Sequence, residues 1–182
     1  MKIEKTNIEG LLLIEPSIFK DGRGYFLESY NQKTFKKFSL NIDFVQDNIS
    51  KSVKGTIRGL HYQIGEFAQV KLCSVIFGKV LDVAVDIRVG SPTYGNYFSC
   101  ELSEDNKLQL WIPIGFAHGF SVLSDEAIFS YKCTKNYNKE SERSIIYNDS
   151  DLNIDWKVDN PILSEKDLQS VKFSEIGRDF TY

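Results

Sequence analysis

VKLCSVIFGKVLDVAVDIR, residues 70–88, consists of two strand-forming segments separated by Gly78. Val70–Phe77 and Lys79–Arg88 are rich in β-branched residues and are bounded by turn-forming residues, which is typical of strands. A lone glycine between two such segments predicts a tight hairpin. The run Gly90-Ser91-Pro92-Thr93 predicts a turn that ends the second strand.

Strand signals of the same kind recur along the chain, in Gly10–Glu15, Leu108–Ile112 and Ala127–Cys133. Helical signals are confined to Asn31–Phe38 and Ser164–Leu168, each of which opens with a residue that can cap a helix. Many short strands without intervening helices predict an all-β sandwich or barrel with a few short helices. The length of 182 residues and the even composition predict one domain over residues 1–182.

Composition narrows the classes of partner. The chain has 22 Lys and Arg residues against 25 Asp and Glu, a net charge of −3, so we expect no nucleic-acid partner. Charged residues stand where a signal peptide needs an apolar run, and no apolar stretch is long enough for a membrane span. We therefore expect a cytoplasmic protein without a membrane partner. The odd number of cysteines, Cys73, Cys100 and Cys133, predicts reduced thiols packed in the core.

The two histidines are the main candidates for chemistry. His61 lies in GTIRGLHYQ, residues 55–63, and His118 lies in WIPIGFAHGF, residues 111–120. His61, Lys71 and Tyr131 each fall in or at the end of a predicted strand, so the three side chains can converge on one cavity. Two distant histidines without an H-x-H pair do not match a histidine-based metal site, so we expect proton transfer without a metal.

Five ordered blocks resemble the dTDP-4-dehydrorhamnose 3,5-epimerase family. They are DGRGYFLE (21–28), FVQDNISKS (44–52), RGLHYQ (58–63), DVAVDIR (82–88) and GFAHGF (115–120), and the resemblance runs from about Ile3 to Asp167. It implies a cupin-type jelly-roll barrel, a homodimer and no cofactor. It also implies a dTDP-linked 4-keto-6-deoxyhexose as substrate, inverted at C3 and C5 on the route to dTDP-L-rhamnose.

The resemblance also assigns catalytic roles that suit the chemistry. A ketone at C4 acidifies the hydrogens on C3 and C5, so inversion needs a base on one face, a group that stabilises the enolate oxygen, and an acid on the other face. The resemblance implies His61 as the base, Lys71 as the stabiliser and Tyr131 as the acid. It places the carboxylate of Asp167 behind His61, where it fixes the imidazole tautomer.

Further residues are implied to bind the substrate. Arg23 and Arg58 are forked donors that suit the phosphate oxygens. The groups implied at the nucleotide and the sugar are Phe26, Glu28, Gln46, Asp47, Asn48, His118, Tyr137, Glu142 and Lys166.

The sequence leaves alternatives open. Stopping after one exchange needs only a small change in geometry, so the enzyme inverts either both carbons or one of them. A nucleotide-sugar 3,4-ketoisomerase would also move protons beside a ketone, and a non-catalytic nucleotide-sugar-binding cupin is a third reading. A non-catalytic protein should have lost His61 or Tyr131, and both are present.

Overall fold

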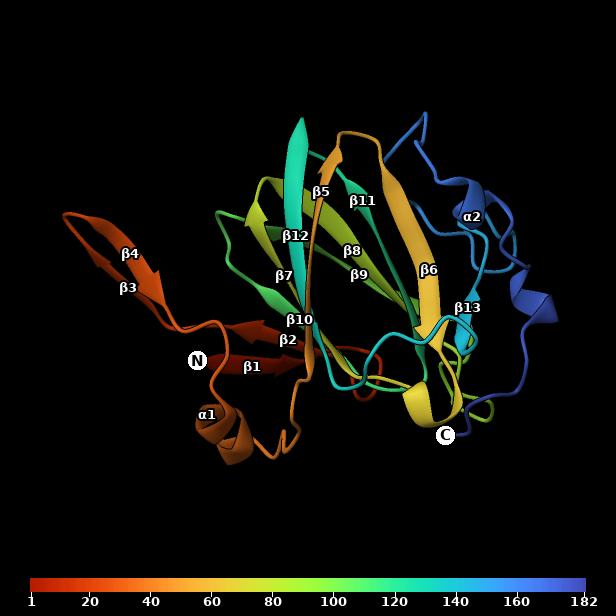
Figure 1. Ribbon diagram of the computed structural model, residues 1–182, viewed down its shortest axis with the longest axis horizontal. Coiled ribbons are helices and arrows are strands. Elements are labelled where there is room, and N and C mark those ends of the chain that lie inside the picture. The colour runs from red at the N-terminus through yellow and green to blue at the C-terminus, as the bar shows by residue number, and fades with distance from the viewer.

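A computed structural model describes residues 1–182, and its strands build two facing antiparallel sheets (Figure 1). The six-stranded sheet contains, in spatial order, β1 (Lys2–Lys5), β2 (Leu12–Glu15), β10 (Gln109–Ile112), β7 (Lys71–Phe77), β12 (Glu126–Cys133) and β5 (Gln46–Val53). The five-stranded sheet contains β13 (Glu142–Ser144), β6 (Ile57–Gln63), β11 (Phe116–Val122), β8 (Lys79–Asp86) and β9 (Tyr97–Ser103). The prediction of an all-β fold is confirmed.

The predicted hairpin at Gly78 is wrong, because β7 and β8 belong to different sheets. Gly78 has a φ of 75°, and a Cβ at this position would lie 2.1 Å from the carbonyl oxygen of Glu126. Both facts require glycine, since only glycine combines this backbone conformation with so close an approach. The residue therefore marks the point where the chain crosses from one sheet to the other.

Two short helices agree with the predictions. α1 (Gln32–Lys37) is capped by Asn31, whose side chain accepts hydrogen bonds from two backbone N–H groups of the first turn. α2 (Glu165–Leu168) is capped by Ser164. Single 3-10 turns at Gly65–Phe67 and Phe173–Glu175 were not predicted. None of these helices is long and apolar enough to cross a membrane.

Three apolar layers hold the sheets in place. The largest layer lies between the sheets and includes Val80, Ala84 and Phe129. A second layer covers the outer face of the five-stranded sheet, where segments after β13 contribute Leu152 and Trp156. A third layer packs α1 against the six-stranded sheet. Because β8 and β11 are covered on both faces, polar side chains that they turn inward are held in fixed positions.

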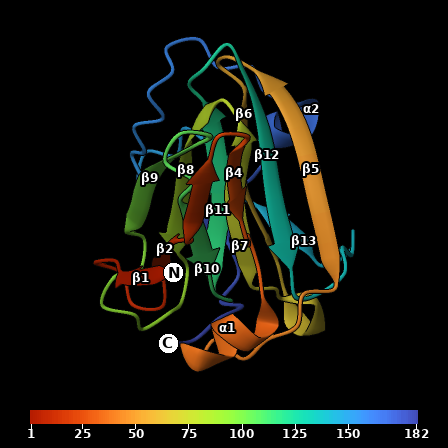
Figure 2. The same ribbon diagram turned by 90° about the vertical axis from the view of Figure 1, so that its left-hand side faces the viewer.

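A hairpin projects from this body in Figure 1, and in Figure 2 it points toward the viewer in front of the sheets. It consists of β3 (Ile18–Asp21) and β4 (Gly24–Leu27), which pair only with each other. Its apolar side chains are largely exposed, with Phe19 at 63% and Phe26 at 67%. We call residues 18–27 the arm.

Candidate active site

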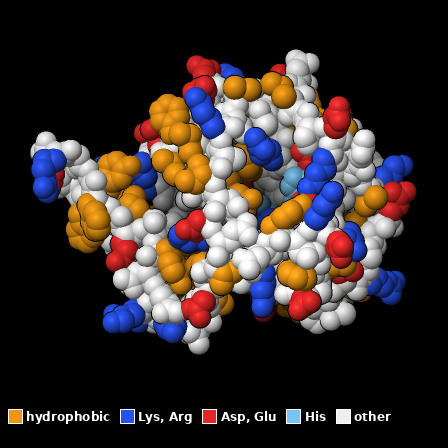
Figure 3. Space-filling view, viewed as in Figure 1, with side chains coloured by type: hydrophobic (Ala, Val, Ile, Leu, Met, Phe, Trp, Pro, Cys, Tyr) orange, Lys and Arg blue, Asp and Glu red, His pale blue; other side chains and the backbone are white.

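Strand alternation aims a set of polar side chains into a cavity of about 410 Å³ between the sheets. On β7, Lys71 shares the inward face with the core residues Cys73 and Val75, and on β12 Tyr131 shares it with Phe129. The cavity is lined from β5, β6, β7, β11 and β12, and α2 closes one side. Figure 3 shows the hollow, with basic side chains at its rim and a histidine inside.

His61 lies on β6 and is paired with a buried carboxylate. Its Nε2 is 2.6 Å from Oδ1 of Asp167, a residue of α2 that is only 3% exposed. Ser164 donates its hydroxyl hydrogen bond to the other carboxylate oxygen at 2.8 Å. Burial would raise the pKa of Asp167, but the hydrogen bonds from His61 and Ser164 outweigh it and hold the pKa below its usual value. An ionised carboxylate only accepts hydrogen bonds, so Nε2 carries the proton and Nδ1 keeps a lone pair.

Lys71 and Tyr131 lie next to each other in the same cavity. The Nζ of Lys71 donates to the backbone carbonyl of His61 at 3.4 Å and lies 5.9 Å from the centroid of the Tyr131 ring. Burial raises the pKa of Tyr131 to about 12, so its phenol keeps the proton at neutral pH. The cavity therefore combines an imidazole paired with a carboxylate, a lysine amine and a protonated phenol.

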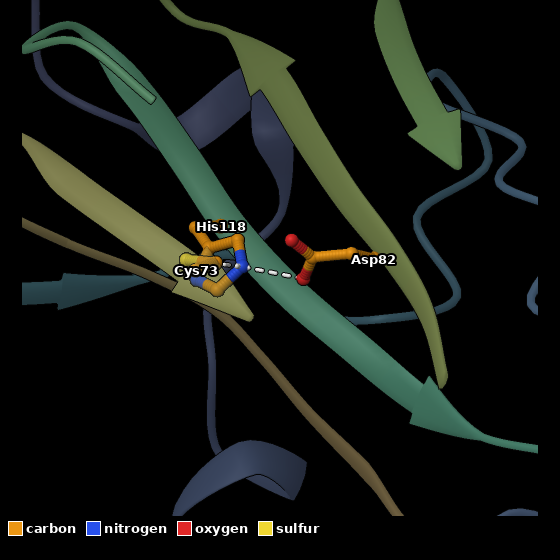
Figure 4. A group of neighbouring side chains, drawn as sticks. All are labelled: Cys73, Asp82 and His118. Carbon is orange, nitrogen blue, oxygen red and sulfur yellow. Dashed lines mark hydrogen bonds and ion pairs between the residues drawn. The ribbon is translucent and has the colours of Figure 1, made fainter. Parts of the chain in front are cut away.

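His118 forms a second histidine–carboxylate pair (Figure 4). It lies on β11 directly opposite His61 in the strand register, and its Nε2 is 2.7 Å from Oδ1 of Asp82 on β8. The Sγ of Cys73 lies 3.7 Å from the same nitrogen. Burial lowers the pKa of His118, and Asp82 opposes this shift only in part. The three donor atoms lie within 4.8 Å of one another, but a metal ion would have to displace the proton that Nε2 and Asp82 share.

Polar side chains at the rim form a connected network. The hydroxyl of Tyr137 donates to Glu142 at 2.8 Å, and the ammonium of Lys166 lies 2.5 Å from the same carboxylate oxygen. Gln46 accepts the backbone N–H of Tyr137 at 2.8 Å and donates to Asn48 at 2.9 Å. The rim thus offers fixed donors and acceptors beside the cavity.

Comparison with known proteins identifies the family. The family model described as dTDP-4-dehydrorhamnose 3,5-epimerase matches residues 5–175. The chain belongs to this family. It is therefore an isomerase-class enzyme, an epimerase.

Individual relatives cover nearly the whole chain. The dTDP-4-dehydrorhamnose 3,5-epimerase of Shigella flexneri is 53% identical over 95% of this chain and 96% of the relative. A crystal structure shows the dTDP-6-deoxy-D-glucose-3,5-epimerase of Legionella pneumophila in complex with dTDP-4-keto-L-rhamnose. Its sequence is 49% identical to this chain, and the two structures superpose with a TM-score of 0.94 over 100% of this chain and 98% of the Legionella chain. A 3'-monoepimerase from Streptomyces bikiniensis, solved in complex with dTDP-quinovose, is 30% identical in sequence and superposes with a TM-score of 0.90, over 97% of this chain and 92% of the Streptomyces chain. These likenesses confirm the cupin-type jelly roll.

Most residues that the family resemblance implied lie together in this epimerase. The implied residues that line the cavity are Gln46, Asn48, Arg58, His61, Lys71, His118, Tyr131, Tyr137, Glu142, Lys166 and Asp167. The Nε of Arg58 donates to the hydroxyl of buried Ser52 at 3.0 Å, which orients the guanidinium at the mouth of the cavity.

Four implied residues do not line the cavity of this chain. Arg23 and Phe26 lie on the exposed arm, and Glu28 follows it. Asp47 points to the outer face of β5, where both of its oxygens accept hydrogen bonds from Lys132. The side chain of Asp47 therefore points away from the cavity, because neighbouring residues of a strand face opposite ways and Gln46 and Asn48 face inward. A contact of Asp47 with the substrate stays a prediction.

Sequence reasoning missed several residues of the site. The strand pattern places Asp82 in a strand without giving it a role, although a carboxylate inside an apolar run signals a buried partner. The hydroxyl of Ser50 lines the cavity, is buried and has no hydrogen-bond partner. Other lining residues that were not anticipated are Ile49, Tyr62, Gln63, Gln69, Phe120, Phe129, Cys133 and Ser164.

Proposed function

We propose that the chain inverts C3 and C5 of dTDP-4-keto-6-deoxy-D-glucose on the route to dTDP-L-rhamnose. The observation that carries this function is the His61–Asp167 pair, whose free Nδ1 shares a cavity with Lys71 and Tyr131. The Legionella relative in complex with dTDP-4-keto-L-rhamnose supports the choice of ligand.

Four side chains in the cavity supply the groups that the proton transfers need. Nδ1 of His61 takes the hydrogen beside the ketone as a proton, and the electron pair of the broken C–H bond moves into the enolate. The ammonium of Lys71 stabilises the negative charge that develops on O4, while Asp167 stabilises the new imidazolium. Tyr131 then donates its phenolic proton to the other face of the carbon. Water restores both residues, and no cofactor is needed because nothing is oxidised or reduced overall.

Side chains at the rim of the cavity supply groups that suit the nucleotide. Arg58 and Lys166 are exposed cations that suit the diphosphate, since a guanidinium can bind phosphate oxygens through two parallel hydrogen bonds. Gln46, Asn48 and Tyr137 offer amide groups and an exposed aromatic ring for the base and the ribose. We place the reaction in the cytoplasm, in agreement with the three free cysteines.

Proton NMR of dTDP-4-keto-6-deoxy-D-glucose incubated with the enzyme in heavy water tests the function. We expect deuterium at both C3 and C5 and conversion to the inverted sugar. Exchange and inversion at C3 alone would instead indicate a monoepimerase like the Streptomyces relative. Migration of the ketone to C3 would indicate the 3,4-ketoisomerase, and a lack of any exchange would contradict an enzymatic role.

We also propose a homodimer in which the arm of one copy completes the cavity of the other. The arm exposes Phe19 and Phe26 and carries Arg23, yet none of them reaches the cavity of its own chain. The edge strand β5, which lines that cavity, exposes Ile49 and Val53 on its surface. Burying both apolar surfaces against each other would bring Arg23 and Phe26 to the nucleotide end of the partner's cavity.

Complementation between two weakened variants tests this arrangement. Arg23→Ala removes the arm cation and His61→Ala removes the base, so each homodimer should be strongly impaired. After the two variants are unfolded and refolded together, a heterodimer should contain one intact site, and roughly one quarter of all sites should recover. Activity that stays at the sum of the separate variants, with dimers verified by light scattering, would show that each arm serves its own chain.

A further inference from the structure

The carboxylate of Asp82 has one partner in the folded chain. Asp82 is 0% exposed, and its Oδ1 lies 2.7 Å from Nε2 of His118, while its Oδ2 is buried without any hydrogen bond. Cys73, the other polar neighbour, lies 3.7 Å from the same nitrogen (Figure 4). Burying a carboxylate with so little compensation is costly. The fold therefore holds Asp82 against His118 at the expense of stability, as is common at functional sites.

The pair fixes where the proton of His118 resides. An ionised carboxylate only accepts hydrogen bonds, so the hydrogen bond requires the proton on Nε2. Burial lowers the pKa of His118, and the nearby charges of Lys71 and His61 lower it further, so the ring holds one proton at neutral pH. Nδ1 then carries a lone pair. It has no partner within the protein and is not one of the buried unpaired atoms, so it reaches the cavity that His118 lines.

We propose, on the basis of the proposed function, that Asp82 is a positioning residue that locks His118 in the Nε2–H tautomer so that Nδ1 accepts a hydrogen bond from a hydroxyl of the hexose. His118 faces His61 directly in the strand register, which puts this acceptor beside the reacting carbon. Lys71, a donor without accepting capacity, meets the ketone oxygen in the same cavity. The two groups together distinguish the ketone from the neighbouring hydroxyl and so set the orientation of the ring.

Asp82→Asn should invert the tautomer while keeping the size of the side chain. The buried amide has one group facing Nε2 and one in the place of Oδ2, which has no partner. An unpaired buried carbonyl is tolerated better than an unpaired N–H, so the NH₂ group should donate to Nε2 and move the imidazole proton to Nδ1. A donor would then face the sugar hydroxyl, and kcat/KM should fall roughly 10- to 100-fold.

Long-range ¹H–¹⁵N spectra of the histidine rings read the tautomer directly. The chain contains 2 histidines, so the His61→Ala variant assigns the signals of His118. We expect the Nε2–H pattern in the wild type, the Nδ1–H pattern in Asp82→Asn, and an unchanged pattern in the matched control Cys73→Ala, which alters the other neighbour of Nε2.

The outcomes separate this inference from the proposed function. An Nδ1–H pattern in the wild type would overturn the inference even if Asp82→Asn failed to fold. A tautomer switch with full activity would overturn the role as hydroxyl acceptor, and so would equal losses in Cys73→Ala and Asp82→Asn. A wild type with the Nε2–H pattern but without epimerase activity would contradict the proposed function and leave the tautomer assignment intact.

Discussion

His61→Ala is expected to abolish deuterium exchange at both C3 and C5 while dTDP still binds. In the proposed function the imidazole takes part in the proton transfer, whereas rim residues that line the same cavity, such as Arg58 and Lys166, bind the nucleotide. General base catalysis contributes roughly 10²- to 10⁴-fold, so the rate of exchange should fall by at least that factor, which leaves no exchange above background. Exchange is followed by proton NMR in heavy water, and dTDP affinity by calorimetry.

Two further variants separate the loss of a base from the loss of packing. His61→Gln keeps a polar side chain of similar length and should be as inactive as His61→Ala, because an amide cannot take a proton near neutral pH. Asp167→Asn keeps the imidazole but replaces the acceptor for Nε2–H, and it should reduce exchange without eliminating it. Exchange at the normal rate in His61→Ala would remove His61 from the mechanism.

The sequence predicted individual strands better than their partners. Runs of β-branched and aromatic residues with a flanking Gly, Asn or Asp located β7, β8 and β12. Among the strands that the sequence pattern missed, β5 is half exposed and rich in polar residues, and β11 is buried on both faces and so lacks alternation. The sequence predicts a hairpin at Gly78 instead of a crossing between sheets, because a glycine with positive φ serves either purpose and only long-range pairing decides between them.

In the candidate site, too, local features could be predicted from the sequence and long-range contacts could not. Alternation from Cys73 to Lys71 and from Phe129 to Tyr131 follows from local sequence, so the inward direction of both side chains could be foreseen. The contact of Asp167 with His61 spans 106 positions and depends on how the last segment folds back, which periodicity does not encode. The resemblance supplied that pairing, but it could not reveal that Arg23 and Phe26 lie outside the cavity of their own chain.

Tyr131→Phe is expected to separate exchange from inversion. The substitution removes only the hydroxyl, and the ring can keep its packing against Phe129, whose centroid lies 6.0 Å away. His61 can still remove a proton and return a deuteron to the same face, so exchange at C3 or C5 should remain measurable. Inversion needs a donor on the opposite face and should therefore fall much further, by roughly 10²-fold or more. Both quantities come from one NMR time course in heavy water.

The ratio of the two losses is the informative quantity. Tyr62→Phe is the matched control, since Tyr62 also lines the cavity and burial raises its pKa to about 12, but it lies on β6 beside His61 and has no part in the proposed proton transfers. That variant should keep both exchange and inversion. If Tyr131→Phe lost both to the same extent, the hydroxyl would act before deprotonation, by holding the ring in place. If inversion persisted unchanged, the proton on the far face would come from another acid, and the raised pKa of Tyr131 would reflect burial alone.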